Sequence, residues 1–99
     1  HYEYKYLSSN VKLKTLLEDL EEVSEDTSII IWARFIGEVD LVYDTLLENG
    51  YSVGKYKGGM SDENISLFKQ KKIRILVSTS KGSEGLNLQV ATLHYFFSI

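Results

Sequence analysis

The clearest pattern of apolar and polar positions is a helical one near the start of the chain. Leu13, Leu16, Leu17 and Leu20 recur at the spacing of one helix face, with charged residues between them, which predicts an amphipathic helix over residues 11–23. Residues 37–48 show a second helical pattern, and Asn49-Gly50 follows where a helix can end in a left-handed turn. In this second helix we expect Val39, Val42, Tyr43, Leu46 and Leu47 to face inward and Glu38, Asp40, Asp44 and Glu48 to face outward.

Between these helices the chain carries short apolar runs that predict strands. Residues 29–33 and 73–77 are apolar on both faces, as interior parallel strands must be, and residues 51–56 and 92–97 predict two further strands. A turn at 58–60 leads to a short helix capped by Ser61, and a polar loop covers residues 78–87. Strands that alternate with helices predict a mainly parallel sheet with helices on both faces, a three-layer α/β domain.

The length predicts a single domain over residues 1–99, with residues 1–9 as a lead-in. Because the pattern stops at a core strand without a closing helix, we expect a fold truncated at the C-terminus, a piece of something larger. Cysteine is absent, and His1 and His94 have no partners at metal-ligand spacing, so neither a disulfide framework nor a metal site is predicted. No apolar run approaches the roughly 20 residues of a membrane helix.

Charge divides unevenly along the chain. Residues 1–50 hold 4 basic and 11 acidic side chains, whereas residues 51–99 hold 7 basic and 3 acidic ones. This division is typical of a protein with one solvated acidic face and another face suited to an anion. An alternative stays open, because acidic helix exteriors can simply fall first in the sequence.

The candidate chemistry lies in three loops that follow predicted strands, at residues 34–37, 57–61 and 78–85. Ligands of open parallel sheets bind at the carboxyl ends of the strands. The third loop is the richest, since it offers several hydroxyl groups, the charge of Lys81 and two glycines that permit close approach of a ligand. These groups suit the binding of phosphate oxygens. A serine-rich surface loop without a ligand would have a similar sequence, so that interpretation stays open.

Other features argue for structure rather than chemistry. The run Gly50 to Tyr56 has glycine spacing one residue too short for a phosphate-binding loop and lacks its hydroxyl residue. We expect His94 to be a core or edge residue rather than a base, and Trp32 to be a core residue. The tyrosines at positions 2, 4 and 6 are better explained by packing than by base stacking.

Three segments together resemble the second RecA-like lobe of superfamily-two DNA helicases and translocases. Residues 13–23 with Ile29-Ile-Ile-Trp-Ala-Arg-Phe35 resemble the lead-in helix and the motif IV strand, and Tyr56-Lys-Gly-Gly-Met-Ser-Asp-Glu63 resembles the turn that opens the next helix. Ile75 to Ala91, with Ser-Thr and Gly-x-x-Gly-x-Asn-Leu, is the most specific segment and resembles motif V. The resemblance covers roughly residues 8–98 and is closest to the Swi/Snf-like type, including phage-encoded relatives.

The sequence departs from this family's pattern in several places. Asn64 stands where an arginine is usual, and Ser98 where many members have an aspartate. The arginine-rich motif VI, the phosphate-binding loop and the acidic metal-binding motif are not among these 99 residues. The resemblance therefore implies that the parent enzyme holds ATP and Mg²⁺ mainly through a first lobe, and that this chain alone has no catalytic residue, binds no metal and hydrolyses no ATP.

The resemblance also implies two sets of binding residues within this chain. The residues expected to bind the DNA backbone, independently of sequence, are Ser78, Thr79, Lys81, Arg34, Gly58 and Gly59. Those expected at the ATP cleft are Gly82, Gly85 and Asn87. The first lobe would be the protein partner, no membrane would be involved, and the location would be the cytoplasm of a bacterium or phage-infected cell. Two alternatives stay open: a standalone α/β phosphate- or nucleotide-binding regulatory domain, and a catalytically silent lobe for protein interaction.

Overall fold

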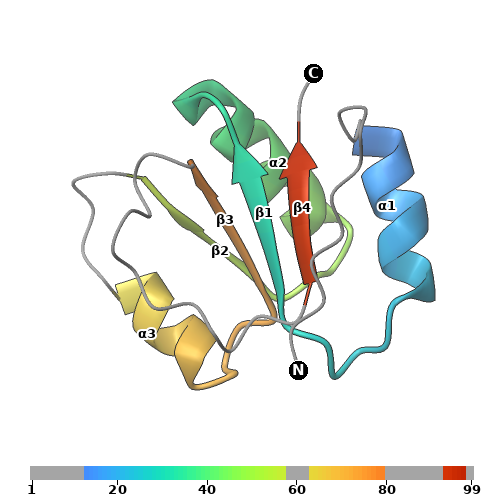
Figure 1. Cartoon of the computed structure of the whole chain (residues 1–99), viewed down its shortest axis with the longest axis vertical. Coiled ribbons are helices and arrows are strands. Elements are labelled where there is room, and N and C mark those ends of the chain that lie inside the picture. The colour runs from blue at the N-terminus through green and yellow to red at the C-terminus, as the bar shows by residue number, and fades with distance from the viewer. Residues whose placement is uncertain (1–12, 58–62, 80–92, 98–99) are drawn as a thin grey trace.

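A computed structural model describes residues 13–57, 63–79 and 93–97. Along the described residues, helices and strands alternate from the first helix to the third strand (Figure 1). Their order is α1 (Leu13–Glu22), β1 (Ile29–Ala33), α2 (Ile36–Glu48), β2 (Val53–Tyr56), α3 (Glu63–Lys69), β3 (Ile75–Thr79) and β4 (Leu93–Phe97). These elements confirm the predicted alternation of strands and helices.

The four strands form one sheet in the order β2-β3-β1-β4, and every described pair is parallel. Strand β1 lies inside the sheet, with Ile29 opposite Ile75 of β3 on one side and opposite Leu93 of β4 on the other. Parallel neighbours require crossovers, and α2 and α3 lie in two of them. The prediction of an α/β fold with a parallel sheet is confirmed.

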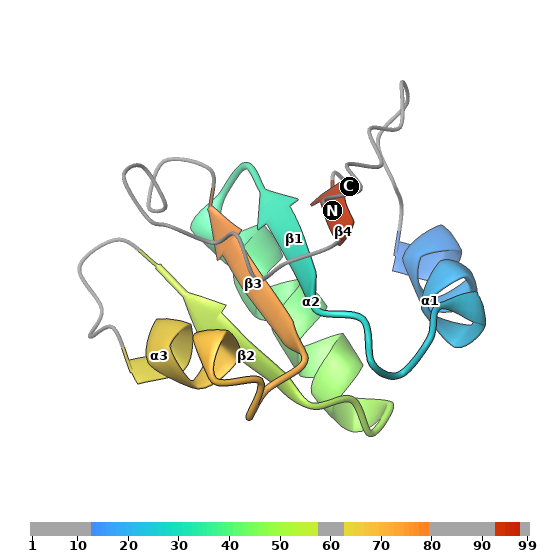
Figure 2. The same cartoon turned by 60° about the horizontal axis from the view of Figure 1, so that its bottom comes forward.

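Helices cover both faces of the sheet, as Figure 2 shows. Because strand side chains alternate, Ile29 and Ile31 of β1 enter one core with Leu16 and Leu20 of α1 and Val42 of α2. Ile30 points to the opposite face. There it packs in a smaller core with Leu76 of β3 and with Ile65 and Phe68 of α3. The sheet is therefore apolar on both sides, which explains the unbroken apolar run of β1.

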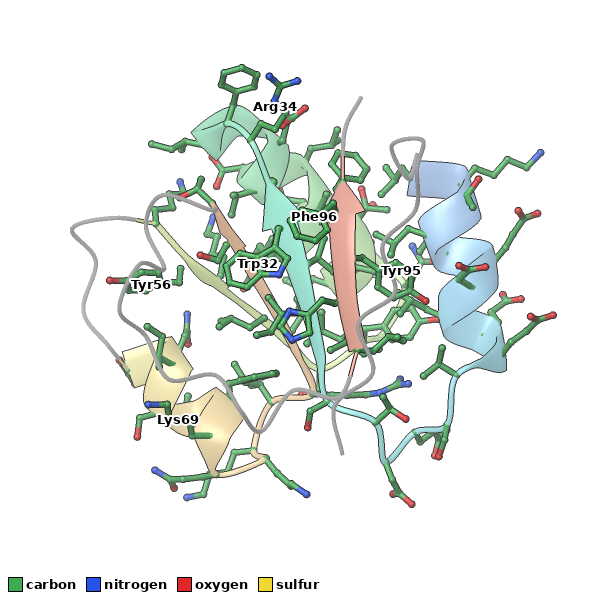
Figure 3. All side chains as sticks on the ribbon, in the orientation of Figure 1. Trp32, Arg34, Tyr56, Lys69, Tyr95 and Phe96 are labelled. Carbon is green, nitrogen blue, oxygen red and sulfur yellow. The ribbon has the colours of Figure 1, made fainter. Side chains whose placement is uncertain are left out.

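Tyr95 ties β4 to the larger core. Its side chain is fully buried, and burial, together with the nearby carboxylate of Asp19 in α1, raises the pKa of the phenol to about 12. In Figure 3 the ring lies between β4 and α1. Tyr95 therefore stays neutral in the folded protein throughout the physiological range.

Helices α2 and α3 end in the same way with different residues. Gly50 has a φ of +83°, and the amide of Tyr51 donates to the carbonyl of Leu46, as the sequence predicted for this end. After α3, Lys71 takes a left-handed φ of 62°, and the amide of Lys72 donates to the carbonyl of Leu67. The amides of Lys72 and Ile73 both donate to the carbonyl of Leu67 in this turn, so these two residues do not join β3.

Two predictions were therefore wrong in detail. Strand β3 covers Ile75–Thr79 rather than 73–77, since its ladder begins where Ile75 donates to the carbonyl of Ser52 and continues until Thr79 lies opposite Ala33. Residues 78 and 79 thus belong to a strand and not to a loop. In α2, Leu47 is 53% exposed and Glu38 is buried, the reverse of the orientation expected from helical spacing.

Candidate nucleic-acid interface

The carboxyl ends of β1, β2 and β3 meet at one edge of the sheet, which we call the carboxyl edge. The register places Tyr56 opposite Ser78, and Thr79 opposite Ala33. Lys57, Thr79 and Arg34 therefore follow one another at this edge, each at or just beyond the end of its strand. Figure 3 shows Arg34 above the end of β1. Three segments far apart in the sequence thus contribute polar or cationic side chains to one edge.

The two hydroxyl residues of this edge are placed differently. Ser78 is fully buried, and its Oγ donates to the carbonyl of Thr79 at 3.0 Å. Thr79 ends β3 and keeps a small exposed fraction. Thr79 is consequently the better placed of the two to contact a ligand above the edge. Ser78 is enclosed by the core, and its hydroxyl hydrogen-bonds to the backbone.

A carboxylate holds the turn that carries Arg34. Oε1 of Glu38 accepts hydrogen bonds from the backbone amides of Arg34, at 3.0 Å, and Phe35, at 3.2 Å. The N-cap position is Phe35, which has no side-chain oxygen for this purpose, so the glutamate three residues later performs the reciprocal half of a capping box. Because Phe35 is not a capping residue, the usual sequence signature is absent, and helical periodicity placed Glu38 in solvent.

The turn also presents an exposed aromatic ring. Phe35 is 64% exposed, and the guanidinium of Arg34 lies 5.8 Å from its ring centroid. An arginine that rests on an aromatic ring keeps its planar donors available to an anion. The Glu38 hydrogen bonds therefore fix the backbone beneath an exposed cation at the carboxyl edge.

A second cationic group at this edge was missed by sequence reasoning. Oδ1 of Asp40 accepts from Nζ of Lys55 at 2.9 Å and from Nζ of Lys57 at 2.7 Å. The hydrogen bonds from Lys57 and Lys55 lower the pKa of Asp40, and the Asp40 hydrogen bond raises the pKa of Lys55. Lys55 also lies 4.7 Å from the ring centroid of Tyr43. One carboxylate of α2 thus holds two lysines at the end of β2.

His94 of β4 contacts Trp32 of β1. Its Nδ1 accepts a hydrogen bond from Nε1 of Trp32 at 3.0 Å, and the two rings stack with centroids 5.9 Å apart. Burial lowers the pKa of His94, which favours the neutral ring that this hydrogen bond requires. The expectation that His94 is a core or edge residue agrees with its burial, whereas Trp32, expected in the core, is only half-buried.

The opposite end of the sheet, which we call the amino edge, contains a pocket of about 300 Å³. Its lining is formed by Glu25, Asp26, Thr27, Ser28, Lys71, Ile73 and Arg74. The Arg74 guanidinium donates to the carbonyls of Thr27, Val23 and Ser24, at 3.1, 3.3 and 2.8 Å. This arginine is thus occupied in holding the turn between α1 and β1.

The remaining candidates, Lys81, Gly58, Gly59, Gly82, Gly85 and Asn87, lie outside the described residues. Within the described ranges, no group of three or more histidine or acidic side chains could hold a metal ion. No helix in that same part of the chain combines the length and apolar character needed to cross a membrane.

Comparison with known proteins identifies the protein family. A family model described as the helicase conserved C-terminal domain matches residues 11–99, and the four-stranded parallel α/β fold is that of a RecA-like helicase domain. The chain belongs to this helicase C-terminal domain family, the second lobe of superfamily-two helicases.

Two particular proteins are similar to it. "Putative DEAD-box ATP-dependent RNA helicase 43" of Arabidopsis thaliana is 32% identical over an alignment of 89 positions, which covers 86% of this chain and 16% of that protein. The crystal structure of the Pyrococcus furiosus Hef helicase domain superposes with a TM-score of 0.69 at 20% identity, covering 88% of this chain and 18% of that one. The chain therefore spans less than a fifth of either relative.

Proposed function

We propose that this chain is the second motor lobe of an ATP-dependent translocase and that its carboxyl edge carries half of a nucleic-acid track. The observation that supports the proposal is the meeting of Arg34, Thr79 and Lys57 at one edge, from three separate segments. Guanidinium, hydroxyl and ammonium groups bind phosphate oxygens without reading bases. Such contacts suit a motor, which must hold every sequence it passes equally well.

On the ATP side the proposal rests on the motif match alone. Gly82, Gly85 and Asn87 would line the cleft that this lobe shares with a first lobe of the parent enzyme, and Lys81, Gly58 and Gly59 would border the track. ATP and Mg²⁺ would be held mainly by that first lobe. Closure of the two lobes on ATP and reopening after hydrolysis would then shift the grip on the strand. We expect no ATP hydrolysis by the 99-residue chain itself.

DNA is the first candidate for the strand, because the turn at Tyr56–Glu63 and the Gly-x-x-Gly-x-Asn-Leu segment resemble the Swi/Snf-like type, including its phage-encoded members. RNA is the second candidate, because the A. thaliana relative is described as an RNA helicase. Both would be bound through the same backbone contacts. We place the parent enzyme in the cytoplasm of a bacterium or of a phage-infected cell.

The test measures binding of labelled single strands of DNA and RNA, matched in sequence, to the chain over a series of salt concentrations. We expect weak binding that falls steeply with salt, because only a few phosphates are engaged. Thr79→Val keeps the shape of the side chain and removes its hydroxyl, so it should weaken binding about two- to tenfold, the effect of one hydrogen bond. Thr27→Val, at the amino edge, is the matched control and should leave binding unchanged.

Other outcomes would contradict the proposal. Absence of salt-dependent binding to either strand, together with tight binding of a free nucleotide, would favour the standalone regulatory domain. Binding to neither, with a stable protein complex that survives high salt, would favour the interaction lobe. A stronger affinity for RNA than for DNA would replace the first candidate strand by the second.

A further inference from the structure

Three charged side chains share one contact at the end of β2. The Asp40 carboxylate accepts from both Lys55 and Lys57 through the same oxygen, so two positive charges face one negative charge. The group therefore keeps one positive charge in excess. Its members are partly open to solvent, with 23% of the Lys57 side chain and 41% of the Asp40 side chain exposed.

We propose that Lys57 is a phosphate-binding residue of the track, and that Asp40 occupies its ammonium group until a strand phosphate replaces the carboxylate. The inference deepens the proposed function and rests on it. Lys55 would keep Asp40 neutralised after the exchange, so no carboxylate would be left without a cation. The exchange thus transfers a single ammonium group from an internal anion to a strand phosphate.

The register of the sheet supports the position of Lys57 on the track. Lys57 follows Tyr56, which lies opposite Ser78, and Arg34 follows Ala33, which lies opposite Thr79. Lys57, Thr79 and Arg34 therefore form a row across three adjacent strands, about 10 Å long at the usual strand spacing. A row of this length can contact more than one phosphate of a bound strand.

The position of the two lysines along β2 is the reason to propose Lys57, rather than Lys55, as the one that exchanges. Lys55 belongs to β2 itself, and its ammonium lies 4.7 Å from the Tyr43 ring centroid. Asp44 of α2 also attracts it and contributes to its raised pKa. Lys57 lies beyond the last residue of the strand, at the carboxyl edge. Its ammonium lies 2.7 Å from Oδ1 of Asp40, so the exchange replaces one charge-assisted hydrogen bond by another, to a strand phosphate.

The experiment measures affinity for a labelled single strand at several salt concentrations, for the unaltered chain and five variants. Lys57→Gln should weaken binding about five- to tenfold at about 0.1 M salt and reduce the salt slope by about 0.7–0.9, the values for one lost phosphate contact. Lys72→Gln removes an exposed lysine near the amino edge and should change neither quantity. Lys57→Arg keeps the charge and should restore binding.

Asp40→Asn gives the sharper test, because it is expected to strengthen strand binding whereas Lys57→Gln is expected to weaken it. Without the competing carboxylate, binding should become about two- to fivefold tighter, the factor that an exposed ion pair represents. Asp44→Asn removes the same charge one turn further along α2 and should have a smaller effect. Urea unfolding of every variant shows that the affinities compare folded proteins.

The outcomes separate this inference from the proposed function. If the unaltered chain shows no salt-dependent binding, both fall. If it binds, yet Lys57→Gln behaves like Lys72→Gln, the role of Lys57 is overturned while the track remains. If Asp40→Asn weakens binding as Lys57→Gln does, Asp40 positions the lysine rather than competing for it, and the exchange is refuted.

Discussion

The two edges of the sheet both carry cations, and they use them in opposite ways. At the amino edge the Arg74 guanidinium donates to three backbone carbonyls and holds a turn in place. At the carboxyl edge two lysines share a single carboxylate oxygen, and Arg34 lies on an exposed ring. The acceptors that a cation already has, rather than its charge, determine whether it can take an external phosphate. A pocket of about 300 Å³ lies at the amino edge, beside the arginine whose donors are already used.

The largest expected effect comes from Arg74→Ala. The variant leaves three carbonyls of the turn between α1 and β1 without their charged donor, so the free energy of unfolding should fall by about 1.5–3 kcal/mol. Urea denaturation measures this loss. Arg74→Lys keeps the charge without the planar fork of donors and should recover only part of it.

Nucleic-acid affinity of the same Arg74 variants tests whether the amino edge takes part in strand binding. We expect it to stay close to that of the unaltered chain, since the guanidinium is occupied by backbone carbonyls. A loss of affinity as large as that from Lys57→Gln, with unchanged stability, would show that the amino edge also contacts the strand.

A smaller effect is expected at the turn of the carboxyl edge. Glu38→Ala removes the acceptor of the Arg34 and Phe35 amides and should lower the free energy of unfolding by about 1–2 kcal/mol, the usual cost of a lost cap. Glu38→Gln retains an oxygen that can accept both bonds and should be milder. Because the turn carries Arg34, Glu38→Ala should also weaken strand binding, whereas an unchanged affinity would remove Arg34 from the track.

The smallest effect is confined to mildly acidic solution. Burial lowers the pKa of His94 below 6.5 in the folded state, so below that pH the unfolded chain binds more protons than the folded one. Stability should therefore fall as pH decreases from about 6.5, by about 1.4 kcal/mol for each unit of pKa difference. Denaturation between about pH 5 and 7.5 measures this slope, and His94→Gln should flatten it. An unchanged slope in His94→Gln would assign the dependence to other groups.

Much of the fold could be predicted because local patterns and long-range packing agree. The two-faced apolar run at Ile29–Ile31 indicated an interior strand, and the helical spacing of Leu16 and Leu20 indicated a buried helix face. Strand β3 was misplaced because Ser78 and Thr79 are polar, and polarity alone suggested a loop. Their burial depends on pairing with Trp32 and Ala33 of a distant strand.

The candidate site was harder to predict for the same reason. Arg34 and Thr79 could be proposed from the order of strands and loops, since carboxyl ends of parallel strands meet at one edge. The Asp40–Lys57 pair depends on how α2 packs against β2, which no local pattern encodes. The spacing of Lys55 and Lys57, two residues apart at the end of β2, was the available hint, and using it required knowing which helix lies beside them.

The interior position of β1 has a consequence for how the protein is made. Synthesis runs from the N-terminus, so Ile29–Ala33 leaves the ribosome before β3 or β4 exists, and its partners Ile75 and Leu93 come far later in the chain. An apolar strand with both edges unpaired is a template for aggregation while it waits. Until β3 and β4 have been synthesised, this interior strand of the finished domain has neither of its partners and is a vulnerable segment of the nascent chain.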